Sequence, residues 1–163
     1  VSGSNRSWHF CVMSFVYRTT STRWKDTLLT GEGARLLGGR WNLPGQPMVY
    51  TASSRSLAYL ELLVHTGTED IPDGLLMVTL EIPDELIATL AQLPDEWGAI
   101  PPQQVSMQWG SNWAVLSQDL ALRVPSVVVP EETNVLINPQ HPAITQVRIM
   151  ALDRMDLDPR LLI

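Results

Sequence analysis

GEGARLLGGRWNLPGQPMVYTASSRSLAYLELLVH, residues 31–65, is a glycine-rich segment followed directly by a strand-like run and a helix-like run. Its first twenty residues hold five of the ten glycines in the chain, together with Arg35 and Arg40. Glycines permit positive φ and close approach of backbone to a ligand, and an arginine offers a planar fork of donors to a phosphate or carboxylate. The segment therefore indicates either a site for an anionic ligand or a surface turn with solvated arginines.

The helix-like run covers residues 54–65 and begins with a serine that is able to cap a helix. Glu61 and His65 lie along the edge of its apolar stripe, which consists of Leu57, Leu60 and Val64. A carboxylate in that position must be neutralised, pair with an arginine, bond to nearby backbone, or face a cleft where a ligand uses it. His65, near the helix end, suits a C-terminal cap better than a catalytic base.

Ser126 lies further along the chain, between two apolar segments and close to Pro125 and Pro130. Its hydroxyl is either satisfied in the core or directed into a pocket, and no G-x-S-x-G elbow marks it as a nucleophile. Residues 138–142, NPQHP, are typical of a rigid turn. The three histidines stand far apart without a cysteine pair, so the sequence indicates no metal site, and it contains no P-loop.

The remaining apolar runs predict a sheet with irregularly placed helices. Helices are expected at residues 84–90 and 111–117 besides 54–65, and strands at residues 15–18, 48–52, 75–82, 120–124, 127–129 and 147–152. Strands dominate this pattern. It favours a single α+β domain with a mixed, mainly antiparallel sheet and flanking helices over a doubly wound parallel sheet.

Composition restricts the class of protein. The 163 residues suit one domain with a packed core, since 45% are hydrophobic and 17% charged. A formal charge of −6 argues against a nucleic-acid-binding face. Ten of the eleven basic residues are arginines, so an anion site would use guanidinium groups. A lone cysteine and the lack of a long apolar run predict a cytoplasmic protein without membrane spans.

Residues 1–12 show neither helical nor strand periodicity and lack the features of a signal peptide. We expect them to be a disordered leader or added sequence that gives His9 and Cys11 no function. The folded domain is expected to comprise residues 13–163, with no internal repeat or linker.

Four segments, taken in order, resemble the RES domain. They are YR at residues 17–18, GEGARLLGGRWN at 31–42, VYTASSRSLAYLELLVH at 49–65 and VPSVVVPEETNVLINPQHP at 124–142. The family is named for an Arg, a Glu and a Ser. By position within the matching motifs, Glu61 is the family's Glu and Ser126 is its Ser. For the Arg there are two candidates, Arg18 and Arg40, because both lie in matching segments. Tyr50 matches a further pocket tyrosine.

The resemblance implies a toxin of a bacterial toxin–antitoxin pair, with a fold like that of ADP-ribosyltransferases and a pocket for NAD. The catalytic residues would be Arg40, Glu61 and Ser126, and the NAD-binding residues Arg18, Arg40, Tyr50, Glu61 and Ser126. NAD would be the substrate, broken down with water or phosphate as acceptor or used to ADP-ribosylate a protein. The implied partner is an Xre-like antitoxin that covers the active site and carries any DNA binding. A silent nucleotide-binding regulator and a pure antitoxin-binding module are the alternatives.

Overall fold

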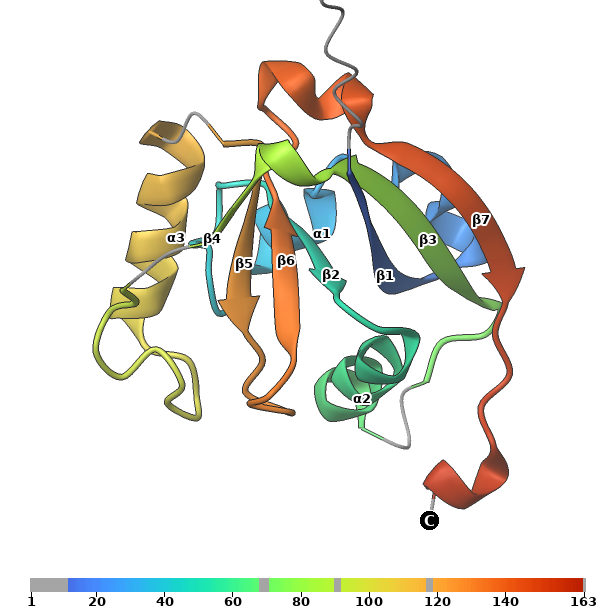
Figure 1. Cartoon of the computed structure of the whole chain (residues 1–163). Helices are drawn as coiled ribbons and strands as arrows, with labels where there is room; N and C mark the ends of the chain where they lie inside the picture. Colours follow the sequence, from blue (N-terminus) through green and yellow to red (C-terminus); the bar gives the residue numbers. More distant parts are fainter. Residues whose placement is uncertain (1–11, 68–70, 90–91, 117–118, 163) are drawn as a thin grey trace, which may run out of the picture.

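The strands of the protein form one mixed sheet, shown in Figure 1. The structure is a computed structural model that describes residues 12–67, 71–89, 92–116 and 119–162. Within these residues seven strands lie in the order β4-β5-β6-β2-β1-β3-β7. Only β4 and β5 run parallel, so the predicted α+β class and mainly antiparallel sheet are confirmed. The strands are β1 (Met13–Ser21), β2 (Val49–Ala52), β3 (Leu75–Pro83), β4 (Ile87–Thr89), β5 (Ala121–Pro125), β6 (Thr133–Ile137) and β7 (Arg148–Arg154).

The sheet is nearly divided between β1 and β2. These two strands share a single residue pair, Tyr17 with Ala52, whereas β1 pairs with β3 along its whole length. Two ladders, β4-β5-β6-β2 and β1-β3-β7, therefore meet at one point and separate on either side of it (Figure 1). A sheet that opens in this way leaves polar and backbone groups near its middle available to a ligand.

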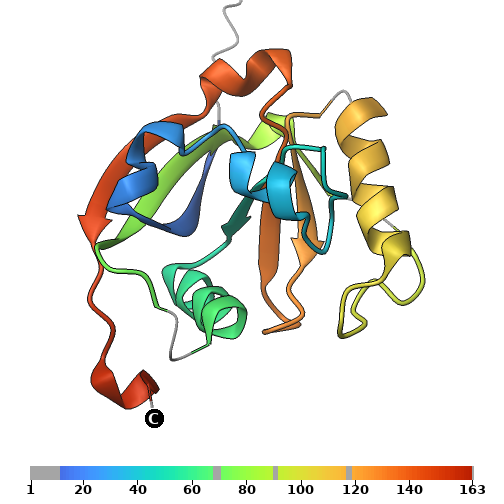
Figure 2. The same ribbon diagram turned by 180° about the vertical axis from the view of Figure 1, so that it is seen from behind.

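Helix α2 (Arg55–Thr66) follows β2 directly and lies below it in Figures 1 and 2. The Ser54 hydroxyl accepts a hydrogen bond from the Leu57 amide at 3.0 Å, which confirms the predicted N-cap. Leu57 and Ala58 are buried against Ala52 and the β3 side chains. The predicted stripe is only partly correct, because Leu60 and Val64 are exposed while Leu57 enters the core.

Helix α3 (Gln104–Leu116) starts seven residues earlier than the sequence predicted. Gly110, in the middle of this helix, has a low helix propensity. Packing requires it, because a Cβ there would lie 2.0 Å from the carbonyl oxygen of Trp41. The helix therefore approaches the glycine-rich segment closely. Its tryptophans pack with Trp41 and Met48 over the apolar side chains of β5 and β6. The predicted last helical residue, 117, lies outside the described residues.

A short helix, α1 (Glu32–Leu37), lies inside the glycine-rich segment, where no helix was predicted. It ends at Gly38, whose φ of +73° suits glycine and turns the chain toward Arg40. Figure 2 shows α1 and the 3₁₀ helix η1 (Thr22–Thr27) on the near side of the sheet. The other 3₁₀ helices are η2 (Asp84–Leu86), η3 (Pro142–Gln146) and η4 (Pro159–Leu162).

Two predicted elements, the helix at residues 84–90 and the strand at residues 127–129, differ from the structure. Residues 84–89 form η2 and then strand β4 instead of one helix, because Ile87 is buried and pairs in parallel with Ala121. Residue 90, the predicted end of that helix, is outside the described residues. Residues 127–129 form no strand, since the amides of Val128 and Val129 donate to the Ser126 hydroxyl.

Strand β6 was missed by the sequence prediction. Val135, Leu136 and Ile137 are fully buried because the strand lies between β2 and β5 with both faces covered. A central strand of this kind does not alternate between polar and apolar residues, and its apolar run is too short to stand out. Its position matters for function because it places Asn134 beside α2.

The predicted leader, residues 1–12, falls outside the described residues except for Val12, and so do His9 and Cys11. Among the helices that the structure does describe, none has both the length and the apolar character needed to cross a membrane.

Candidate active site

A cavity of about 1010 Å³ opens where β1 and β2 separate. Side chains reach it from β1, β2, α2 and β6, and from the glycine-rich segment. Its polar and charged lining includes Arg18, Arg40, Tyr50, Glu61, His65 and Asn134. Four of the five residues predicted from the sequence are thus brought together, although they span more than forty positions of the chain.

Glu61 has one carboxylate oxygen fixed by the protein and the other close to a histidine. Its Oε1 accepts hydrogen bonds from Asn134 Nδ2 at 2.6 Å and from Ser126 Oγ at 3.0 Å. Its Oε2 lies 3.5 Å from His65 Nε2, and 22% of the side chain is exposed. Burial raises the pKa of Glu61, but the hydrogen bonds from His65, Asn134 and Ser126 outweigh it, so the pKa is lowered. Glu61 is therefore a carboxylate at neutral pH.

Ser126 is fully buried behind Glu61. Its hydroxyl oxygen accepts hydrogen bonds from the amides of Val128 and Val129 at 3.0 and 3.1 Å. The single hydroxyl proton is donated to Glu61. The resemblance made Ser126 a catalytic and NAD-binding residue; in the structure its hydroxyl bonds to the Glu61 carboxylate, and Ser126 is not among the residues that line the cavity.

Arg40 is partly buried, and its Nη1 donates to the carbonyl oxygens of Trp97 and Ala99 at 2.8 and 2.7 Å. Burial lowers its pKa, and the nearby negative charge of Glu61 acts in the opposite direction. An arginine remains cationic under such a shift. Nη1 is used by the protein, so the rest of the guanidinium fork is the part that an anion in the cavity would meet.

Tyr50 fixes the turn that carries Arg40. Its hydroxyl accepts a hydrogen bond from the Trp41 amide at 2.9 Å and donates to Asn42 Oδ1 at 2.7 Å. Gly39 allows this approach, since a Cβ there would lie 2.6 Å from the hydroxyl oxygen. Burial raises the pKa of Tyr50, so the hydroxyl stays protonated. The glycines thus bring the backbone close to this tyrosine, and the ring, rather than the hydroxyl, is left for a ligand.

Arg18 is the second arginine of the cavity. Its Nη1 donates to the Leu28 carbonyl oxygen at 2.7 Å, while its buried Nε has no hydrogen-bond partner in the part of the chain that the structure describes. Burial lowers its pKa without removing the charge. A partly buried cation that has a free donor, and no carboxylate bound to it among the described side chains, favours an anionic ligand, because an uncompensated charge is costly to desolvate.

The sequence interpretation missed Asn134 and gave His65 only a capping role. Asn134 lies in β6, the strand that was not predicted, and its side chain donates to Glu61. His65 does lie in the last turn of α2, as a cap would, but it is four residues from Glu61 and also reaches its carboxylate. The four-residue spacing was a signal for the histidine, whereas nothing local to residue 134 pointed to the site.

The mouth of the cavity is apolar. Leu37, Val64 and Ile100 all line it and are strongly exposed, with Leu37 at 85% and Ile100 at 82%. We call these three residues the apolar rim. Large exposed apolar side chains around a polar cavity are typical of a surface that contacts another protein.

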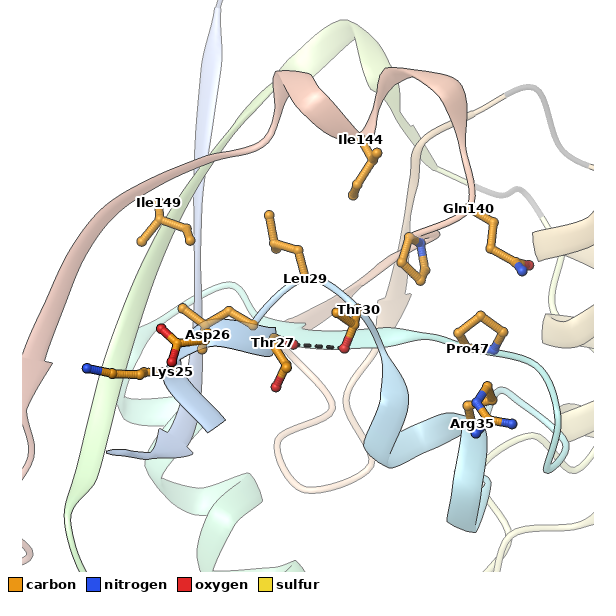
Figure 3. A pocket seen from close by; sticks show the side chains of 12 residues that line it. Lys25, Asp26, Thr27, Leu29, Thr30, Arg35, Pro47, Gln140, Ile144 and Ile149 are labelled. Atoms are coloured by element: carbon orange, nitrogen blue, oxygen red, sulfur yellow. Dashed lines mark hydrogen bonds between the residues drawn. The ribbon is translucent and has the colours of Figure 1, made fainter. Parts of the chain in front are cut away.

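A second cavity of about 550 Å³ is shown in Figure 3. It lies between η1, α1 and the segment that follows β6, with Leu29, Pro47 and Ile144 in its wall. Arg35, at its edge, forms an ion pair of 2.6 Å with Glu32. Because this arginine is already paired and no catalytic set of side chains accompanies it, the larger cavity is the candidate active site.

Metal ligands do not cluster in the part of the chain that the structure describes: no three His, Cys, Asp or Glu side chains gather there as a metal site requires.

Comparison with known proteins gave consistent matches. The sequence family described as the RES domain matches residues 15–158. A Sphingobium sp. protein named Prs ADP-ribosylating toxin is 44% identical over 139 residues, covering 82% of this chain and 86% of that protein. A Photorhabdus laumondii protein named Toxin Res is 40% identical over 126 residues, covering 76% and 81% of the two.

The comparison with solved structures includes a toxin of known fold. It belongs to the M. tuberculosis MbcT-MbcA toxin-antitoxin complex and matches with a TM-score of 0.69, covering 93% of this chain and 87% of that one. At 22% sequence identity this match concerns the fold alone.

Proposed function

The chain belongs to the RES domain family, and on that premise we propose that it is a toxin that consumes NAD by cleaving the bond between nicotinamide and ribose. The observation that carries the proposal is Glu61, an ionised carboxylate fixed by two donors in a cavity that also holds Arg18 and Arg40. The carboxylate matches the positive charge that develops on the ribose, and the two arginines match the negative charge of the pyrophosphate. The cytoplasm, where NAD is abundant, is the compartment in which such an enzyme would act.

Cleavage expels neutral nicotinamide and leaves positive charge on the ribose C1 and ring oxygen. A fixed carboxylate close to that sugar stabilises the developing oxocarbenium ion and can hold ribose hydroxyls. Glu61 suits this role because its Oε1 is held by Asn134 and Ser126 and its Oε2 remains for the substrate. Since these bonds exist before the substrate arrives, the carboxylate needs no rearrangement as charge develops.

Arg18 and Arg40 would bind the pyrophosphate. Each charge-assisted contact of this kind contributes about 1.5–3 kcal/mol. The Tyr50 ring, whose hydroxyl is already used by the Arg40 turn, would stack on nicotinamide. No covalent nucleophile is needed, because positioning and electrostatics supply the rate.

Water or phosphate would accept the ADP-ribosyl group, which amounts to NAD breakdown. A second candidate function is mono-ADP-ribosylation of a cellular protein. The name of the Sphingobium relative, Prs ADP-ribosylating toxin, favours this second function for that protein, and the apolar rim would give a protein substrate a place to dock. The nature of the acceptor is the difference between the two.

We expect the purified protein, free of antitoxin, to release nicotinamide from NAD. With NAD labelled on the adenylate, NAD breakdown predicts label in small molecules, and a new labelled species when phosphate is present. The same reaction in a cell lysate gives the contrast. Label gathered mainly on one protein band would favour the transferase, and failure to release nicotinamide under all conditions would leave a nucleotide-binding regulator or an antitoxin-binding module.

We propose further that the partner is a cognate Xre-like antitoxin that covers this cavity without unfolding the toxin. The MbcT-MbcA structure is that of a toxin-antitoxin complex with the same fold. In this chain, the apolar rim and the two arginines form a surface that suits an apolar segment ending in or carrying a carboxylate.

Inhibition by the antitoxin is therefore expected to compete with NAD and to weaken as salt is raised. Antitoxin is titrated against activity at several NAD concentrations. Leu37→Gln should weaken inhibition while leaving the KM for NAD little changed, because it removes an apolar contact of the rim without adding a charge near the anion site. Leu36→Gln is the matched control, since Leu36 is 60% exposed but does not line the cavity. An inhibition constant that is independent of NAD would instead indicate a remote binding site.

A further inference from the structure

Asn134 sits at the centre of the sheet beside the cavity. In the sheet register it lies between Ala52 of β2 and Val124 of β5. Its side chain crosses to α2, where Nδ2 donates to Glu61 Oε1 at 2.6 Å. The contact links β6 to the helix that carries the carboxylate, across 73 positions of the chain.

Glu61 Oε1 has no further capacity for the substrate. A carboxylate oxygen accepts about two hydrogen bonds, and Asn134 and Ser126 supply both. Ser126 has no freedom either, because its oxygen receives two backbone amides and its only proton goes to Glu61. The two donors therefore leave Oε2 as the oxygen available to a ligand.

The Asn134 amide is held in its orientation at a cost. Its Oδ1 is buried and has no hydrogen-bond partner among the described residues, although its Nδ2 donates to Glu61. Rotating the amide by half a turn would bring Oδ1 against Glu61 Oε1, so that two acceptors faced each other. The bond to the carboxylate therefore fixes the orientation and leaves the carbonyl oxygen unpaired. Local exceptions to hydrogen-bond satisfaction of this kind are expected at functional sites.

We propose that Asn134 is a positioning residue that holds Glu61 so that Oε2 alone faces the ribose of NAD. This proposal rests on the proposed function. Asn134 acts through the carboxylate and does not need to touch the substrate. Its partner in this task is Ser126, which accounts for the burial of that serine. Asparagine suits the position because it donates without adding a charge beside Glu61.

Among the described residues, five other charged or titratable groups line the cavity with Glu61. His65 lies 3.5 Å from Oε2 on the same helix, and its side chain is 76% exposed. The other four are Tyr17, Arg18, Arg40 and Tyr50. Hydrogen bonds from His65, Asn134 and Ser126 keep the pKa of Glu61 low against the effect of burial. Removing the Asn134 donor therefore raises the pKa of Glu61, and the carboxylate is lost at a higher pH than in the wild type.

The test uses Asn134→Leu, which has a similar size and cannot donate. The acid limb of kcat/KM for NAD is expected to move up by about one pH unit, and kcat near neutral pH to fall about 10-fold. A titration of isotope-labelled glutamate by NMR, with the Glu61 signal assigned from Glu61→Gln, should show the same rise of the pKa without any need for activity. Tm should change little, because the unpaired Oδ1 is removed together with the donor.

Asn138→Leu is the matched control. Asn138 lies just after β6 and is buried, and its Nδ2 donates to the Ala114 carbonyl oxygen at 2.7 Å, away from Glu61. This variant should lower Tm and leave the acid limb in place. Asn134→Asp is the second variant; its added carboxylate should move the limb up as well by repulsion.

An unmoved Glu61 titration in a folded Asn134 variant would overturn the proposal, whether or not NAD is cleaved. Wild-type protein that fails to release nicotinamide would count against the proposed function instead. A wild type that is active, with both Asn134 variants retaining its pH profile, would reduce the asparagine to a structural role.

Discussion

Glu61→Gln is expected to lower NAD turnover by about 10²- to 10³-fold with the fold intact, the size typical of losing one preorganised electrostatic group in an active site. The substitution removes the negative charge and keeps the shape. Glutamine still presents an oxygen to Asn134 and Ser126, so the two hydrogen bonds that fix the side chain remain possible. What is lost is the charge that stabilises the oxocarbenium-like ribose.

Nicotinamide release at saturating NAD measures this effect, and thermal unfolding measures whether the fold is retained. Glu32→Gln is the matched control, because Glu32 is exposed on α1 and forms a surface ion pair with Arg35. It should leave turnover unchanged. A folded Glu61→Gln protein that turns over NAD at the wild-type rate would remove Glu61 from the mechanism.

Arg40→Ala is expected to weaken NAD binding by about 10- to 100-fold, since a charge-assisted contact to a phosphate contributes about 1.5–3 kcal/mol. The effect should appear chiefly in affinity, because the pyrophosphate is bound equally in the ground state and the transition state. Part of the loss comes from freeing the segment whose carbonyl groups, at Trp97 and Ala99, are held by Arg40 Nη1.

Calorimetric titration of NAD is performed in the Glu61→Gln background, so that the ligand is not consumed. Arg35→Ala provides the comparison, since Arg35 comes from the same glycine-rich segment but is paired with Glu32 outside the larger cavity. It should bind NAD as before. If Arg40→Ala lowered turnover while its NAD affinity stayed the same, the pyrophosphate contact would have to be assigned to Arg18.

The sequence predicted those parts of the site that local pattern controls. Glu61 stood out because the predicted helix placed it beside apolar residues. The structure has this helix, and α2 begins directly after its N-cap, Ser54. The glycine-rich segment was interpreted as a place where backbone approaches a ligand or as a surface turn; at Gly39 the group that the backbone approaches is the Tyr50 hydroxyl. Helical periodicity and glycine chemistry are local properties, which is why they could be read without the fold.

The features that failed depend on tertiary contacts. Val128 and Val129 have the composition of a strand, yet their amides are taken by the Ser126 hydroxyl next to Pro125. Strand β6 carries no visible alternation because it is covered on both faces, and Asn134 was missed along with it. Ser126 was a candidate through the family resemblance, but its contact with Glu61 follows from packing between a loop and α2, which no local motif encodes.

The tryptophans behind the cavity give the protein a built-in optical reporter. Trp41 lines the cavity, stacks on Trp97 with ring centroids 5.9 Å apart, and meets Trp109 edge-on at 5.5 Å. The Trp41 amide also donates to the Tyr50 hydroxyl, and the Trp97 carbonyl oxygen accepts a hydrogen bond from Arg40 Nη1. A ligand that engages Arg40 or Tyr50 therefore acts on side chains coupled directly to these indoles. Intrinsic fluorescence should follow occupancy of the cavity without a label, in inactive variants as well as in the active protein.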